Sequence, residues 1–153
     1  MTETRNIKIA IVEDLREIRE GLARLINATP GYRCTGTYAS MEEALDKIPS
    51  NLPDLVLSDI GLPGMDGISG IAILKQRYPD LLILMLTVYD DNERIFDALC
   101  AGACGYLLKK TPWEKVVDAG THQVRSSRKS PTPRPHKMIQ IRAFLSVKSA
   151  LSI

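Results

Sequence analysis

Short apolar segments alternate along this chain with segments whose apolar residues recur at helical spacing. The apolar segments cover residues 7–12, 32–38, 55–59, 81–86 and 105–108, and helical spacing follows at about 15–26, 41–48, 68–78, 95–99 and from 111 onward. Short, nearly continuous apolar runs are typical of strands that are covered on both faces. Parallel strands need a crossover helix between them. The alternation therefore predicts an α/β fold, a doubly wound five-stranded parallel sheet with five helices.

Capping residues stand where three of the expected helices begin. Asp14 with Glu17 forms a plausible N-cap pair for the first helix, and Ser40 with Glu43 forms one for the second. Thr111, followed directly by a proline, opens the fifth. These signals support the division into five β-α units.

The residues able to do chemistry stand at the ends of the expected strands. They are Glu13 and Asp14 after the first strand, Asp59 at the end of the third, Thr87 after the fourth and Lys109 closely after the fifth. Open parallel sheets bind ligands at the carboxyl ends of their strands. With the strand order 2-1-3-4-5, which we expect here, four neighbouring strands bring these five residues to one rim of the sheet.

Three carboxylates that converge on one rim repel one another. Two unit charges about 4 Å apart cost on the order of 4 kcal/mol at an effective dielectric constant of about 20. Mg²⁺ offsets such repulsion and binds one or two carboxylates together with waters and phosphate oxygens. Lys109 and Thr87 are the groups that neutralise and hydrogen-bond a phosphoryl group in transfer. Asp59 is a candidate nucleophile, because carboxylates form aspartyl-phosphate intermediates.

Each of these residues also has a purely structural interpretation. Acid pairs after a strand often cap a helix, and an Asp at a strand end is often a turn residue. Lys109 with Lys110 could be a solvated pair in a loop. Their joint placement at one rim favours a functional site over these separate interpretations.

Four motifs carry a family resemblance that extends from residue 7 to about residue 118. They are Ile-Val-Glu13-Asp14, Asp59-Ile-Gly-Leu-Pro-Gly-Met-Asp-Gly67, Met-Leu-Thr87 and Ala101-Gly-Ala-Cys-Gly-Tyr-Leu-Leu-Lys109. Together they resemble the receiver domain of bacterial two-component response regulators, whose fold is CheY-like (flavodoxin-like). The stretches around Thr87 and Lys109 further resemble the NarL/FixJ-like branch, whose members carry a C-terminal LuxR-type helix-turn-helix.

The resemblance implies a site and a partner. A sensor histidine kinase would transfer a phosphoryl group to Asp59, and the chain would catalyse this transfer and its own dephosphorylation rather than act as a conventional enzyme. Lys109 and Thr87 would contact the phosphoryl group. The implied Mg²⁺ ligands are Glu13, Asp14, Asp59 and the backbone carbonyl of Gly61.

The resemblance also implies a switch. The added charge would draw Thr87 toward the phosphoryl group and open space for Tyr106, which would change the surface of the fourth helix, fifth strand and fifth helix. Taken alone, Tyr106 is expected to be half-buried with its hydroxyl in water. Val88, at a position that is usually small in the family, together with Tyr89 predicts slow loss of the phosphoryl group. A homodimer formed on phosphorylation is a further expected partner.

A flavodoxin-like FMN protein is the alternative from another class, because it shares the strand order. It would need a phosphate-cradling loop after the first strand. This chain has Glu13 and Asp14 there, and both would repel the phosphate.

Charge is divided unevenly along the chain. All 18 acidic residues lie at or before Asp118, where they outnumber 13 Lys and Arg, whereas the last 35 residues hold seven Lys or Arg and no acid. We therefore divide the chain into a receiver domain, residues 1–120, and a basic tail containing Pro and Ser, residues 121–153.

The tail is too short for a helix-turn-helix, so DNA binding through a complete domain is not expected of it. A solvated tail, an electrostatic arm for nucleic acid or acidic membrane, and a shifted reading frame all stay open. The polar N-terminus has no apolar segment of the kind that secretion requires, and no apolar run is long enough to span a bilayer. A cytoplasmic protein without membrane contact is expected.

Overall fold

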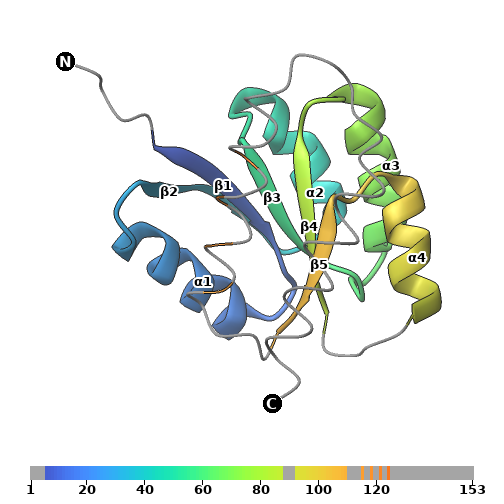
Figure 1. Ribbon diagram of the computed structural model, residues 1–153, viewed down its shortest axis with the longest axis horizontal. Coiled ribbons are helices and arrows are strands. Elements are labelled where there is room, and N and C mark those ends of the chain that lie inside the picture. Colours follow the sequence, from blue (N-terminus) through green and yellow to red (C-terminus); the bar gives the residue numbers. More distant parts are fainter. Residues whose placement is uncertain are drawn as a thin grey trace.

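The computed structural model describes residues 6–87 and 92–109 and the single residues Lys115, Asp118, Thr121 and Val124. Five strands form one parallel sheet of order β2-β1-β3-β4-β5 (Figure 1). They are β1 (Ile7–Val12), β2 (Tyr32–Tyr38), β3 (Leu55–Asp59), β4 (Leu82–Thr87) and β5 (Gly105–Leu108). The expected α/β class and strand order are confirmed.

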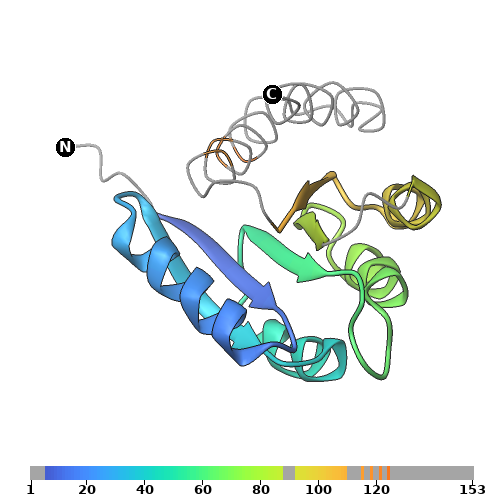
Figure 2. The ribbon, with the colours of Figure 1, turned by 90° about the horizontal axis from the view of Figure 1, so that it is seen from below.

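Four helices are described in full. They are α1 (Arg16–Ala28), α2 (Met41–Lys47), which runs into the short 3-10 helix η1 (Ile48–Ser50), α3 (Gly67–Arg77) and α4 (Asn92–Ala101). The view from below shows α3 and α4 side by side (Figure 2). The start of the expected fifth helix at Thr111 lies outside the described residues. The four single residues beyond it that are described are all helical.

The two faces of the sheet have separate apolar cores, because successive side chains of a strand point to opposite faces. Val56 and Ile83 lie in a cluster with residues of α2, α3 and α4. Leu57 and Leu84 lie in a second cluster, where Ile26 of α1 packs. β1, β3 and β4 are thus covered on both faces at the centre of the sheet, and the candidate site lies at the carboxyl ends of these strands.

Val124 belongs to the second cluster and is 2% exposed. Val124, which follows the boundary expected at residue 120, therefore packs among the apolar residues of this face. No helix within the described part of the chain is both long and apolar enough to cross a membrane.

Of the helix caps predicted from the sequence, the one of α2 is present and the one of α1 is not. Ser40 caps α2, since its Oγ accepts the Glu43 N–H at 3.2 Å. The N-cap of α1 is Leu15, with no side-chain hydrogen bond, so the cap expected of Asp14 was wrong. The carboxylate of Asp14 instead joins the acidic group described below. Asp66, which the sequence reasoning passed over, caps α3 by accepting the Ser69 N–H at 2.8 Å.

Candidate functional site

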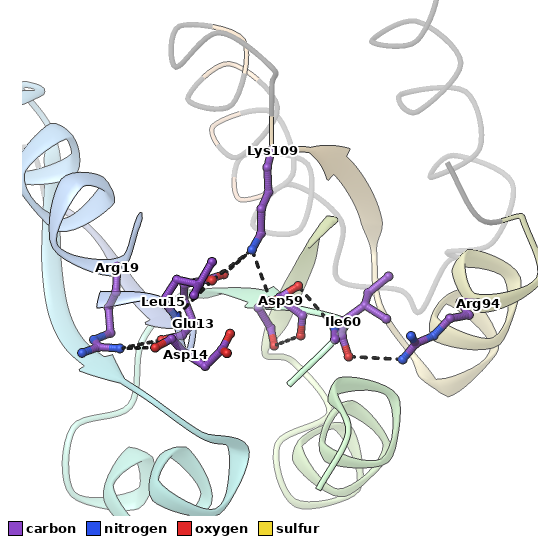
Figure 3. A network of polar contacts seen from close by, with 10 residues as sticks. Glu13, Asp14, Leu15, Arg19, Asp59, Ile60, Arg94 and Lys109 are labelled. Carbon is purple, nitrogen blue, oxygen red and sulfur yellow. Dashed lines mark hydrogen bonds and ion pairs between the residues drawn. The ribbon is translucent and has the colours of Figure 1, made fainter. Parts of the chain in front are cut away.

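The three expected acids meet at the carboxyl edge of the sheet. Glu13 and Asp14 follow β1, and Asp59 is the last residue of the adjacent strand β3. One carboxylate oxygen of each lies within 4.8 Å of the others (Figure 3). Asp14 is exposed, whereas Glu13 is fully buried and Asp59 is 8% exposed. The group thus has a buried inner part and a side that is open to solvent.

Lys109 reaches both buried carboxylates from just beyond β5. Its Nζ lies 2.8 Å from Oε2 and 3.0 Å from Oε1 of Glu13, and 3.3 Å from Oδ2 of Asp59. The backbone N–H of Lys109 donates to the Thr87 carbonyl at 2.8 Å, which ties the lysine to the end of β4. Side chains that follow β1, β3 and β5 therefore meet at one edge of the sheet, and the Thr87 backbone links the end of β4 to them.

The carboxylate of Asp59 is held at both oxygens. Oδ1 accepts the Gly61 N–H at 3.2 Å, and Oδ2 faces Lys109. The loop after β3 is closed by the Gly67 N–H, which donates to the Ile60 carbonyl at 3.2 Å. A Cβ on Gly67 would lie 2.5 Å from the backbone oxygen of Asp59, so only glycine fits this closure. The loop fixes Asp59 and places Gly61, the expected carbonyl ligand, next to it.

Burial and charge shift the pKa values of the two most tightly coupled groups. Burial raises the pKa of Glu13, and the negative charge of Asp59 adds to this although Lys109 opposes it. Burial alone would lower the pKa of Lys109, but the hydrogen bond to Glu13 and the attraction of both carboxylates outweigh it and raise this pKa. Lys109 is therefore a permanent positive charge at neutral pH.

The two expected switch residues lie on adjacent strands. Thr87 is 7% exposed at the end of β4. Tyr106 is 4% exposed and pairs with Met85 in the β4–β5 register. Tyr106 is thus more deeply buried than its sequence alone suggested, because it lies in the core cluster shared with α3 and α4. Val88 and Tyr89 lie outside the described residues.

The acidic group suits a hard divalent cation. Its donors are oxygens, as Mg²⁺ prefers. Oε2 of Glu13 is buried and accepts no hydrogen bond of good geometry from the described residues, although the Lys109 ammonium lies beside it. A carboxylate oxygen has two lone pairs, so Oε2 can accept a second cation or a water besides Lys109. The residues present therefore fit a metal ion.

Three long side chains near the site were missed by sequence reasoning. Arg19 donates to the backbone carbonyl of Glu13 at 2.8 Å, and Glu42 of α2 accepts the Met65 N–H at 2.5 Å. Arg94 of α4 donates to the Ile60 carbonyl at 3.4 Å. All three bind backbone groups of the site's loops. Every residue has the same backbone groups, so a side chain that binds them cannot be paired with its partner from the sequence.

A parallel five-stranded sheet with carboxylates and a half-buried lysine at its carboxyl edge is the architecture of a signal receiver domain. Comparison with known protein families agrees with this: the sequence model of the family described as response regulator receiver domain matches residues 9–120. The chain belongs to this family.

The relatives of this chain include regulators of transcription. The chain is 40% identical over 111 residues to the uncharacterized transcriptional regulatory protein YhcZ of Bacillus subtilis, covering 72% of this chain and 52% of that protein. It is 38% identical over 103 residues to the DNA-binding transcriptional activator DevR/DosR of Mycobacterium tuberculosis, covering 67% and 48%. The chain thus spans about half the length of the curated relatives it matches.

A solved structure supports the same assignment. The signal receiver domain of the putative response regulator NarL from Mycobacterium tuberculosis superposes with a TM-score of 0.75 at 26% identity, covering 79% of this chain and 98% of that one. The chain is therefore a receiver domain of the LuxR/NarL type. The FMN alternative has no support from the comparisons, and Glu13 and Asp14 still stand where an FMN phosphate would bind.

Proposed function

We propose that this chain accepts a phosphoryl group on Asp59 and that Mg²⁺ assists the transfer. The observation that carries the proposal is the placement of the Asp59 carboxylate between two further acids and Lys109 at the carboxyl edge of the sheet. Response regulators receive their phosphoryl group from sensor histidine kinases. A phosphohistidine of such a kinase is therefore the proposed donor.

In the proposed reaction, a carboxylate oxygen of Asp59 forms a bond to phosphorus while the phosphorus–nitrogen bond of the donor histidine breaks. The electron pair of that bond leaves with the imidazole nitrogen. Glu13, Asp14, Asp59 and the Gly61 carbonyl would hold Mg²⁺, which when bound neutralises charge that builds on the phosphoryl oxygens. Lys109 supplies a second positive charge beside Asp59, and the Thr87 hydroxyl hydrogen-bonds the transferred group.

Output is proposed to pass through the surface beside this site. Thr87 and Tyr106 lie on neighbouring strands, so movement of Thr87 toward a phosphoryl group changes the space open to Tyr106 beside α4. Control of transcription is proposed for the longer parent protein, because the relatives are transcriptional regulators and this chain spans about half their length. Homodimer formation, the division at residue 120, the nature of the basic tail and the cytoplasmic location stay predictions.

Phosphorylation with acetyl phosphate and Mg²⁺, followed by intact-protein mass spectrometry, tests the proposal. The wild type is expected to gain one phosphoryl group, and Asp59→Asn is expected to gain none. Asp66→Asn is a matched control, since asparagine still caps α3 and the change removes one nearby carboxylate. Equal labelling of Asp59→Asn and the wild type would exclude Asp59 as the acceptor.

A further inference from the structure

Arg94 connects the first turn of α4 with the loop that follows the proposed phosphoacceptor. Its Nη2 donates to the carbonyl oxygen of Ile60, 34 residues away in sequence, at 3.4 Å (Figure 3). The helix that carries Arg94 is anchored by Ile95 and Ala98, which are 5% and 1% exposed in the core shared with α2 and α3. The backbone of Arg94 is thus positioned by how α4 packs, and its exposed side chain extends from there to the loop.

The carbonyl that Arg94 binds belongs to the same planar peptide group as the N–H of Gly61. In a trans peptide the C=O and N–H point in opposite directions. The N–H of this peptide donates to Oδ1 of Asp59 at 3.2 Å. A single peptide group therefore has the Arg94 guanidinium on one side and the Asp59 carboxylate on the other.

Hydrogen bonds linked through one polar group strengthen each other, because each polarises the shared group. A cationic donor at the Ile60 carbonyl makes the Gly61 N–H a stronger donor to the Asp59 carboxylate. It also resists rotation of the peptide, which would carry the Gly61 N–H away from Asp59. The Gly67 N–H shares the same carbonyl at 3.2 Å, so the peptide is held from α3 and from α4.

We propose that Arg94 is a positioning residue that fixes the Ile60–Gly61 peptide and thereby orients the Asp59 carboxylate. The contact makes this orientation depend on the position of α4. Movement of α4 then changes the reactivity of Asp59, and chemistry at Asp59 acts on α4 by the same route. This inference rests on the proposed function of Asp59 only for its effect on phosphorylation, because the geometry itself needs neither metal nor phosphoryl group.

The test is the NMR resonance of the Gly61 amide in metal-free protein, together with the rate of labelling by acetyl phosphate and Mg²⁺. Arg94→Met is expected to move the Gly61 amide proton upfield and to slow labelling about three- to tenfold, as for the loss of one supporting hydrogen bond. Arg94→Lys, which keeps a cationic donor, is expected to restore both in part. Arg77→Met, which removes the same charge from the exposed last turn of α3, is expected to change neither.

An unchanged Gly61 amide in folded Arg94→Met overturns the proposal, and so does an equal effect of Arg77→Met, which would point to net charge. If circular dichroism shows that Arg94→Met does not fold, Arg94→Gln is judged by the same two readouts. Failure of the wild type to be labelled would overturn the function proposed for Asp59. It would leave the amide measurement valid, because that spectrum is recorded without phosphodonor.

Discussion

The ammonium nitrogen of Lys109 lies 2.8 Å from Oε2 of Glu13, closer than the 3.3 Å that separates it from Oδ2 of Asp59. Without metal, the lysine is thus paired chiefly with the fully buried acid and only secondarily with the proposed phosphoacceptor. A cation that binds Glu13 must compete with Lys109 for the same carboxylate. Release of Lys109 from Glu13 then makes its charge available to the phosphoryl group on Asp59.

Removal of Lys109 is expected to strengthen metal binding. Lys109→Met removes the ammonium that lies between Glu13 and Asp59, so a bound metal relieves more of the repulsion among the three acids. We expect Mg²⁺ affinity to rise about tenfold, equivalent to about 1.4 kcal/mol, in isothermal titration calorimetry. Lys47→Met removes a surface lysine that pairs with Glu43 and is expected to leave the affinity unchanged. Weaker Mg²⁺ binding in Lys109→Met would contradict competition for Glu13.

Neutralising the buried acid is expected to stabilise the metal-free protein. A fully buried carboxylate whose pKa is raised by burial is held in its charged form at a cost. Glu13→Gln is expected to raise the free energy of unfolding by about 1 kcal/mol at neutral pH, the usual gain from relieving a functional site. The wild type is expected to melt at a higher temperature when Mg²⁺ is added, and the same variant is expected to lose this rise. A lower free energy of unfolding for Glu13→Gln than for the wild type in metal-free buffer would show that the charged form of Glu13 does not destabilise the fold.

The same pKa predicts how stability changes with pH. The folded protein retains the Glu13 proton above the ordinary value of 4.5, so this group favours folding most below 4.5. Its contribution is lost as pH rises through the raised pKa of the folded state. Lys109 has a raised pKa as well, so its contribution is present below its ordinary value of 10.5 and is lost at higher pH. Urea unfolding between pH 4 and pH 8 is expected to show a decline in wild-type stability relative to Glu13→Gln.

Much of this architecture could be predicted from sequence, and the reasons differ between elements. The buried strands of the sheet are short runs of apolar residues, and their ends fix which side chains meet at the rim. The apolar run at residues 81–86 placed the fourth strand one residue early, since β4 covers Leu82–Thr87 and Thr87 pairs with Leu108. The cap predicted for the first helix was wrong. An acid that follows a strand can either cap the next helix or join a group of carboxylates, and the sequence alone does not distinguish the two. That Lys109 lies closer to Glu13 than to Asp59 depends on how the side chains pack, which the spacing of residues in the sequence does not reveal.

Two glycines are expected to respond in opposite ways to alanine. At Gly67 the added Cβ would meet the Asp59 backbone oxygen at 2.5 Å, so Gly67→Ala forces the loop away from α3. A loss of about 1–3 kcal/mol of stability is expected, as for other overpacked sites. Slower labelling of Asp59 should accompany it.

Gly21 is the matched control for this change. It lies within α1 and has nothing within 4 Å of an added Cβ. Gly21→Ala is expected to gain about 0.5–1 kcal/mol, because alanine is the better helix former. Urea denaturation measures both variants. If Gly67→Ala does not change the stability, the loop after β3 can shift to accommodate the added Cβ despite the short backbone contact.

The end of the folded unit can be found from Val124. This residue is 2% exposed among the apolar residues of the face that α1 covers, although the charge pattern placed the domain boundary at residue 120. Burial of a valine contributes about 1.5–3 kcal/mol. A chain that ends after residue 120 is therefore expected to unfold at a lower urea concentration than one that ends after residue 126. Val124→Ser in the longer chain should reproduce most of the loss, since it removes the apolar contact and keeps the chain length. If the two chains instead unfold at the same urea concentration, the boundary at residue 120 is supported and the burial of Val124 does not stabilise the fold.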